Sequence, residues 1–132
     1  ARIDHTNISL SSFKLPQTEN ALVIEGAGGC LVPLNDENFV IDLASLLNVP
    51  VVLVSNHYLG SINHTLLTLE ALQARSIEIK GLVFNGDANE ESERIILRHA
   101  KLECLLRVAR EPSLDRSVIK KYAGLLKSKL HG

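Results

Sequence analysis

Residues 49–61 read VPVVLVSNHYLGS, and this stretch sets the architecture. Positions 49–54 are almost all β-branched or leucine, which is typical of a strand buried on both faces of a parallel sheet. A polar link at 55–60 follows, and from Ser61 the leucines recur at helical spacing as far as Arg75. A buried strand, a short loop and an amphipathic helix in this order predict a strand–helix–strand unit.

The same alternation extends along the rest of the chain. Strands are predicted at Ala21–Ile24, Val49–Val54, Ile79–Phe84 and Leu102–Val108, with a short extended piece at Cys30–Leu34. Helices are predicted from a cap at Asp36 or Asn38 to Leu47, and then at 61–75, 89–99 and 114–130. The predicted fold class is α/β, a parallel sheet flanked by helices on both faces. Residues 1–20 are predicted to be a connecting arm with at most one helical turn, and residues 21–132 to be the core of a single domain.

The composition limits the classes of function. The chain has 132 residues, of which 45% are hydrophobic, and a formal net charge of -1. This near-neutral balance gives no electrostatic argument for nucleic-acid binding, and the apolar runs are far too short to cross a bilayer. Cys30 and Cys104 both lie in apolar runs, so we predict free thiols in a reducing cytoplasm. The chain contains no methionine and opens on Ala1, which predicts a piece of a longer protein.

A glycine-rich turn follows the first predicted strand. In Glu25-Gly26-Ala27-Gly28-Gly29, an acid closes an apolar run and precedes residues whose backbone N–H groups an anion can approach closely. A carboxylate beside bound phosphates is a setting that suits Mg²⁺. The turn therefore indicates a metal–phosphate site or, alternatively, a simple reversal of the chain, and the residues leave both interpretations open.

Further loops are predicted at the same edge, because the carboxyl ends of parallel strands collect there. Gly60 and Ser61 begin a helix whose free N–H groups and positive dipole end favour an anion, although ordinary capping by Ser61 explains the pattern equally well. Asn85 offers a donor and an acceptor that match a purine edge, but Asn-Gly is also a common turn dipeptide. The loop at 109–113 is expected beside them.

For other polar residues, the sequence indicates no zinc site and favours local or surface roles. His57 and His64 are not at zinc-ligand spacing with any nearby cysteine or acid, and His64 is expected to make a local hydrogen bond. Along the helix predicted at 89–99, the charged side chains are expected to form a solvated face. These residues are Glu90, Glu91, Glu93 and Arg94.

Four segments taken together are similar to a known family. Val23–Gly29, Val32–Leu34, Tyr58–Thr65 and Gly81–Asn85 resemble, in order and spacing, dethiobiotin synthase of biotin biosynthesis. The combination of the glycine turn with Leu-Gly-Ser-Ile-Asn-His at 59–64 is the specific part. The resemblance implies a P-loop NTPase-like fold and a ligase that depends on ATP and Mg²⁺. Such a ligase carboxylates 7,8-diaminononanoate with CO₂ or bicarbonate and closes the ring to dethiobiotin.

The resemblance also implies roles for individual residues. Glu25 corresponds to a Mg²⁺ ligand at the nucleotide phosphates, and the backbone of Gly26, Ala27 and Gly28 to contacts with phosphate or carbamate. Asn85 and Gly86 correspond to the position that reads adenine. In this family the substrate carboxylate is held by a helix start from the neighbouring subunit of a homodimer. The corresponding residues here are Gly60, Ser61, Ile62 and Asn63.

The chain also departs from the family pattern. No Gly-Lys pair occurs in the 132 residues, so the phosphate-binding Gly-x-x-x-x-Gly-Lys-Ser/Thr loop and the catalytic lysines are expected upstream of Ala1. We therefore predict that the chain is the C-terminal part of a P-loop ligase domain, holds no catalytic residue itself and is inactive alone. Tyr58 stands where the family often has lysine, and 107–110 differs from the family's Gly-x-Ile-Pro nucleotide loop.

Two alternatives stay open on the sequence. Another P-loop ligase, such as a cobyrinate amidating enzyme, shares a glycine turn after the acid but not the motif at 59–64. A non-catalytic α/β scaffold or dimerisation module would keep the fold without the chemistry.

Overall fold

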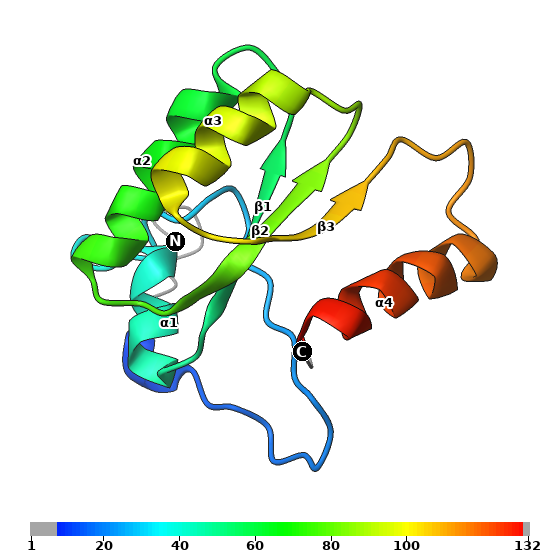
Figure 1. The fold of residues 1–132 in the computed structure, drawn as a ribbon. Helices are drawn as coiled ribbons and strands as arrows, with labels where there is room; N and C mark the ends of the chain where they lie inside the picture. The colour runs from blue at the N-terminus through cyan, green and yellow to red at the C-terminus, as the bar shows by residue number, and fades with distance from the viewer. Residues whose placement is uncertain (1–7, 131–132) are drawn as a thin grey trace.

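A parallel sheet of three strands lies at the centre of the protein, whose computed structural model describes residues 8–130. The strands are β1 (Val51–Asn56), β2 (Ile79–Asn85) and β3 (Cys104–Val108), in the order β1-β2-β3 (Figure 1). Both neighbouring pairs are parallel, and the register places Phe84 beside Ser55 on one side and beside Arg107 on the other. This sheet with its flanking helices confirms the predicted fold class.

The two crossover helices cover one face of the sheet. These helices are α2 (Ser61–Ala74) and α3 (Glu90–Ala100). Both connections step in the same direction across the sheet, and right-handed crossovers therefore place both helices on the same side. Between them and the sheet lies the main core, formed by Leu69, Leu82, Phe84, Ile96 and Ala100.

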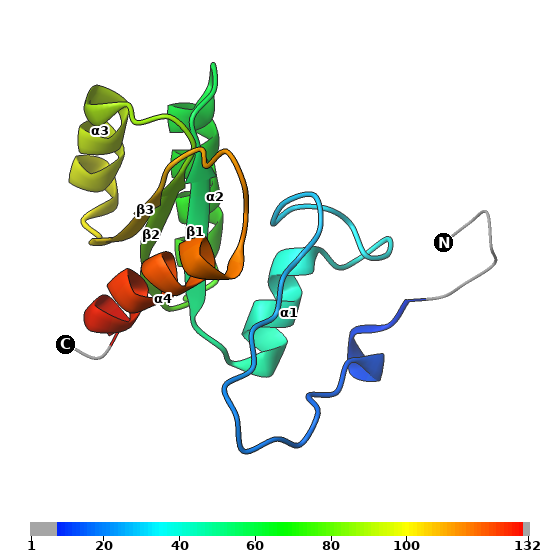
Figure 2. The same cartoon turned by 90° about the vertical axis from the view of Figure 1, so that its right-hand side faces the viewer.

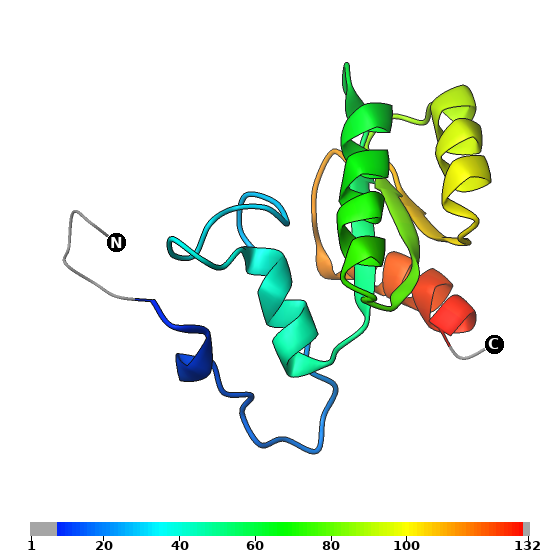
Figure 3. The ribbon, with the colours of Figure 1, turned by 90° about the vertical axis from the view of Figure 1, so that its left-hand side faces the viewer.

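The last helix, α4 (Arg116–Leu130), lies on the side of the sheet opposite α2 (Figures 2 and 3). Val118, Tyr122 and Leu126 are half-buried at a spacing of one turn, but Ile119 and Leu125 are exposed. The helix predicted at 114–130 is therefore present, but part of its apolar surface is left exposed. Helix α4 packs mainly on β3, and a narrow stripe of its surface is covered.

Helix α1 (Val40–Leu47) begins later than the sequence predicts. The expected cap at Asp36 or Asn38 is wrong, because the Oδ1 atom of Asn35 accepts from the backbone N–H of Asn38 at 2.7 Å and forms a turn there. Phe39 takes the cap position, and its N–H donates to the Asp42 carboxylate at 2.7 Å.

A second, smaller core attaches α1 to the beginning of the sheet. Ile41 packs with Leu72 near the end of α2 and with Ile77 just before β2. An ion pair of 2.9 Å between Arg75 Nε and Asp42 Oδ1 ties the same two helices together at the surface of this core.

The strand predicted at Ala21–Ile24 is absent, and that prediction is wrong. The segment is extended but unpaired, and Val23 is 89% exposed. It runs beside α1, apart from the sheet (Figures 2 and 3). A short strand is stable only when neighbouring strands supply hydrogen bonds and a buried surface. Within residues 8–130, β1 pairs with β2 alone, and the free edge of β1 holds no partner strand.

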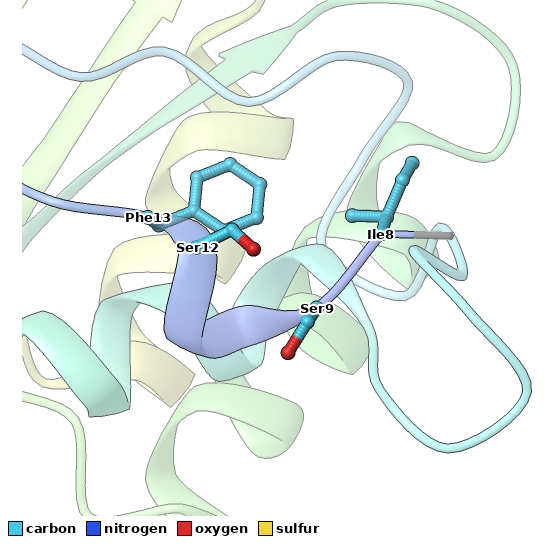
Figure 4. A pocket seen from close by; sticks show the side chains of 4 residues that line it. All are labelled: Ile8, Ser9, Ser12 and Phe13. Carbon is cyan, nitrogen blue, oxygen red and sulfur yellow. The ribbon is translucent and has the colours of Figure 1, made fainter. Parts of the chain in front are cut away.

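The N-terminal arm contains the single helical turn that was expected, a 3₁₀ turn at Leu10–Ser12; residues 1–7 lie outside the described part of the chain. Beside this turn is a small pocket lined by Ile8, Ser9, Ser12 and Phe13 (Figure 4). None of these side chains carries a charge, and the polar groups among them are the hydroxyls of Ser9 and Ser12. Among the described helices, none has both the length and the apolar character needed to pass through a bilayer.

Candidate functional site

Three loops meet at the carboxyl edge of the sheet. They are 55–60, 85–88 and 109–113, and they follow β1, β2 and β3 in turn. Because the strands are parallel, the predicted convergence of these three loops is confirmed. Two hydrogen bonds join the three strands at this edge: the Asn85 amide donates to Asn56 Oδ1 at 2.8 Å, and the Gly86 N–H donates to the carbonyl of Val108, the last residue of β3, at 2.9 Å.

The start of α2 presents free backbone donors to this edge. Gly60, in the left-handed region at φ 96°, is the N-cap residue, so the helix is not capped by Ser61 as one interpretation held. Ser61 is buried, and its N–H donates to the Tyr58 carbonyl at 3.0 Å. Among the described residues, the N–H groups of Ile62 and Asn63 donate no hydrogen bond, and no side chain caps them. The helix start can therefore accept an anion.

Two side chains stand beside that helix start. The Tyr58 hydroxyl and His64 Nδ1 are 2.8 Å apart, which is the local hydrogen bond predicted for His64. The Asn63 side chain is exposed, so it can reach a ligand at the helix start. Ile62 instead packs against the main core and anchors the first turn of α2.

Asn85 ends β2 at this edge, as the sequence predicts. Its amide nitrogen is engaged by Asn56, and among the described residues its carbonyl oxygen accepts no hydrogen bond. Gly86 follows in the left-handed region at φ 105°, which a residue with a side chain rarely adopts. Asn85 and Gly86 therefore do form a turn, and the carbonyl oxygen of Asn85 is still available to a ligand.

The turn Glu25–Gly29 has the predicted local properties, but the prediction that it follows a strand of the sheet is wrong. Gly28 and Gly29 have φ angles of 80° and 120°, and a Cβ on Gly26 would meet Val40 Cγ1 at 2.7 Å. Within residues 8–130, the N–H groups of 26–28 donate no hydrogen bond, and the exposed Glu25 carboxylate makes no ion pair. These groups are open to a ligand, but the turn wraps over the start of α1 and follows no strand.

A buried ionic cluster at the carboxyl edge was not predicted. Glu93 is only 4% exposed, so its assignment to a solvated face is wrong. Its carboxylate accepts a hydrogen bond from His57 Nε2 at 3.2 Å and a second one from Arg107 Nε. Glu93 lies three and seven residues before Ile96 and Ala100, which are both buried. That helical spacing was the available signal, because it places the acid on the inward stripe of α3.

Phe84 forms the floor of this cluster. The His57 ring stacks on the Phe84 ring at 5.5 Å, and the Arg107 guanidinium lies 5.9 Å from its centroid. The hydrogen bond to Glu93 raises the pKa of Arg107, so its positive charge is permanent. Burial raises the pKa of the nearby Cys104 thiol, which is free and neutral, as is expected of a small apolar filler.

The described residues contain no group of three or more His, Cys, Asp or Glu side chains that could hold a metal ion. A metal site with a single carboxylate, such as that of Glu25, does not need a group of this kind. Magnesium bound to phosphates commonly takes only one or two protein carboxylates.

Comparison with known proteins gives a consistent result. The chain is 53% identical over 124 residues to the ATP-dependent dethiobiotin synthetase BioD of Cytophaga hutchinsonii, covering 93% of this chain and 60% of that protein. It is 45% identical over 130 residues to the protein of the same name from Christiangramia forsetii, covering 98% and 62%. With that of Rhodopseudomonas palustris it shares 44% over 119 residues, covering 90% and 57%.

These similarities confirm the resemblance on which the sequence interpretation rests. The chain spans 57–62% of the length of these relatives. A family model described as an AAA domain also matches residues 1–118, which is most of the chain. The chain therefore belongs to the AAA domain family.

Proposed function

We propose that this chain is part of a dethiobiotin synthase. This ligase uses ATP and Mg²⁺ to join 7,8-diaminononanoate with CO₂ and close the ureido ring. The proposal is carried by one observation: proteins named for this activity are 44–53% identical over at least 90% of the chain. The open backbone donors at 26–28 and 62–63 support it, because the reaction involves a triphosphate and a substrate carboxylate.

The proposed role of the turn Glu25–Gly29 is to bind Mg²⁺ and the oxygens of phosphate or carbamate. The Glu25 carboxylate would bind Mg²⁺, and the N–H groups of Gly26, Ala27 and Gly28 would contact phosphate or carbamate oxygens. Such donors position anions without a side chain between backbone and ligand. Phosphoryl transfer from ATP supplies the activation of the carbamate, and positioning with charge neutralisation accounts for most of the protein's contribution to that chemistry.

The second and third loops would hold the two organic ligands. The free carbonyl oxygen of Asn85, next to Gly86, would accept from the adenine amino group. The helix start at Gly60–Asn63 would bind the diaminononanoate carboxylate with the N–H groups of Ile62 and Asn63. In the proposed homodimer this carboxylate site serves the neighbouring subunit. The phosphate-cradling lysine is expected in the part of the polypeptide beyond this chain.

The test compares the longer polypeptide with the 132 residues alone. Each is incubated with 7,8-diaminononanoate, bicarbonate, ATP and Mg²⁺, and dethiobiotin is measured by mass spectrometry. We expect product from the longer polypeptide only, because the chain lacks a Gly-Lys pair. A longer polypeptide that binds ATP but forms no dethiobiotin would favour the scaffold or another ligase. Turnover by the 132 residues alone would refute the assignment of the catalytic lysines to another segment.

A further inference from the structure

The Glu93 cluster spans all three strands at the carboxyl edge. His57 follows β1, Phe84 belongs to β2, Arg107 belongs to β3, and Glu93 reaches them from the first turn of α3. One carboxylate thus accepts from two side chains that are 50 positions apart in the sequence. Within residues 8–130, the Glu93 side chain is the only one that forms hydrogen bonds both to a residue at the end of β1 and to a residue at the end of β3.

This cluster is poorly explained as a device for stability. A buried carboxylate loses its hydration, and its ion pairs commonly repay that loss only in part. His57 adds a second cost, because its Nδ1 atom is buried and has no hydrogen-bond partner among the described residues. A buried polar atom without a partner is destabilising, and an apolar residue at 57 and at 93 would avoid both costs. The cluster is better explained by what it holds in place.

The two donors belong to the two proposed ligand sites. His57 lies in the loop that ends at Gly60, where α2 begins and the substrate carboxylate would bind. Arg107 precedes Val108, whose carbonyl accepts from the Gly86 N–H at 2.9 Å beside Asn85, where adenine would bind. A shift of the loop 55–60 or of the end of β3 changes its distance to Glu93. The carboxylate therefore links the positions of these two segments.

We propose that Glu93 is a positioning residue that couples the substrate site at the start of α2 to the nucleotide site at the end of β2. The coupling rests on the function proposed above for these two sites. Glu93 touches neither ligand. It holds the loop 55–60 and the end of β3 in one arrangement, so that a ligand which orders one loop favours the arrangement that the other ligand needs.

The test replaces Glu93 in the longer polypeptide by glutamine. Glutamine keeps the shape but removes the negative charge and replaces one acceptor oxygen by an NH₂ group, so the charge-assisted bond from Arg107 and the present bond from His57 Nε2 are both weakened. The matched control is Glu91→Gln, on the same helix turn, whose side chain is 79% exposed and pairs only with Arg94. Calorimetry measures the Kd of β,γ-methylene ATP without and with saturating 7,8-diaminononanoate.

In the wild type, the substrate should tighten nucleotide binding by about fivefold or more, the usual range of coupling between sites. Glu93→Gln should bring this ratio close to one, whereas Glu91→Gln should keep the wild-type ratio. Coupling that is unchanged in a folded Glu93→Gln protein would overturn the proposal. If Glu93→Gln does not fold, Arg107→Gln, at a side chain that is 56% exposed, removes one of the two links and should lower the ratio; an unchanged ratio in that variant overturns the proposal equally.

A second measurement separates this proposal from the proposed function. Hydrogen–deuterium exchange of the amides at 55–60 is recorded without ligands in the wild type and both glutamate variants. Faster exchange in Glu93→Gln alone supports the positioning role, even if the wild type makes no dethiobiotin and binds no diaminononanoate. Equal exchange in all three proteins refutes the positioning role, whatever the enzyme assay gives.

Discussion

The turn Glu25–Gly29 and the carboxyl edge of the sheet differ in how their polar groups are satisfied. In the turn, backbone donors and a carboxylate are open to solvent, and the residues before them are exposed. At the edge, the Glu93 carboxylate is buried and accepts two hydrogen bonds from its own protein. The first region is suited to receive a ligand, whereas the second is suited to hold other loops in place.

This difference predicts where a mutation acts. Open groups contribute little to the folded state, since water already satisfies them in the absence of a ligand. Buried groups and the aromatic ring beneath them contribute to stability through packing. Removing the open Glu25 carboxylate should therefore alter chemistry with little effect on stability, whereas changes at the edge should alter stability or loop geometry first.

The largest expected effect comes from the core beneath the edge. Phe84 is 2% exposed, so Phe84→Ala should lower the free energy of unfolding by about 3–5 kcal/mol. Val23→Ala, at the extended segment before the turn, should change it by less than about 0.5 kcal/mol. Urea denaturation measures both. A cost for Val23→Ala similar to that of Phe84→Ala would mean that the segment at 21–24 is buried in solution, and the contrast between the regions would disappear.

The next effect concerns the turn itself. In the longer polypeptide, Glu25→Gln should lower the rate of dethiobiotin formation on the order of 100-fold at fixed Mg²⁺, because the charge of the proposed metal ligand is lost. Excess Mg²⁺ should restore part of the rate, and the melting temperature should not change. Glu19→Gln, at another exposed acid of the N-terminal segment, is the control and should behave as the wild type. Unchanged magnesium dependence in Glu25→Gln would remove this residue from the site.

A smaller effect is expected at the start of α2. Asn63→Ala should raise KM for 7,8-diaminononanoate about tenfold, which corresponds to roughly 1.4 kcal/mol, and should leave KM for ATP unchanged. The physical reason is that the exposed carboxamide stands beside the free N–H groups that would bind the substrate carboxylate. Steady-state kinetics with each substrate varied in turn distinguishes the two constants. Equal increases in both would argue against a carboxylate site at this helix.

The smallest effect concerns α1, which supports the turn. The Phe39 N–H and, less strongly, Arg75 hold the pKa of Asp42 below its ordinary value of 3.8. Since the folded pKa is lowered, the charge stabilises the fold above the unfolded pKa, and that contribution is lost as the pH falls through the folded value. Asp42→Asn should cost about 0.5–1 kcal/mol at pH 7. The difference from the wild type should vanish once the pH has fallen below the folded pKa of Asp42, which lies under 3.8. Denaturant unfolding across pH 2–7 measures it, and a difference independent of pH would exclude the charge as its cause.

Much of the architecture could be read from residue patterns. The alternation of apolar runs and leucine-spaced segments predicted β1, α2, β2, α3 and β3 within about two residues of their observed ends. These elements share a property: each is long enough to show its period, and each packs on a neighbour close in the sequence. The segment at 21–24 showed an equally apolar run, yet it forms no strand, since pairing depends on a neighbour that its own residues do not specify.

The loops that carry the candidate site could also be picked out from residue types. Glycines and polar residues after predicted strands indicated Gly60, Asn85 and the turn at 25–29, because backbone freedom and hydrogen-bonding capacity are properties of single residue types. For the turn, the predicted strand before it does not form. The Glu93 cluster was missed. His57, Glu93 and Arg107 have ordinary surface chemistry when taken one at a time, and a lone acid on a helix is usually solvated.

Sequence patterns alone therefore establish a parallel α/β fold in the AAA domain family, with a glycine turn and a helix start that suit anions. Burial of Glu93, exposure of Val23 and the bond between Asn56 and Asn85 follow from the packed arrangement. The reason is physical. Periodicity and residue chemistry are local, but the cost of burying a charge and the gain from pairing a strand depend on which distant segments come within bonding distance.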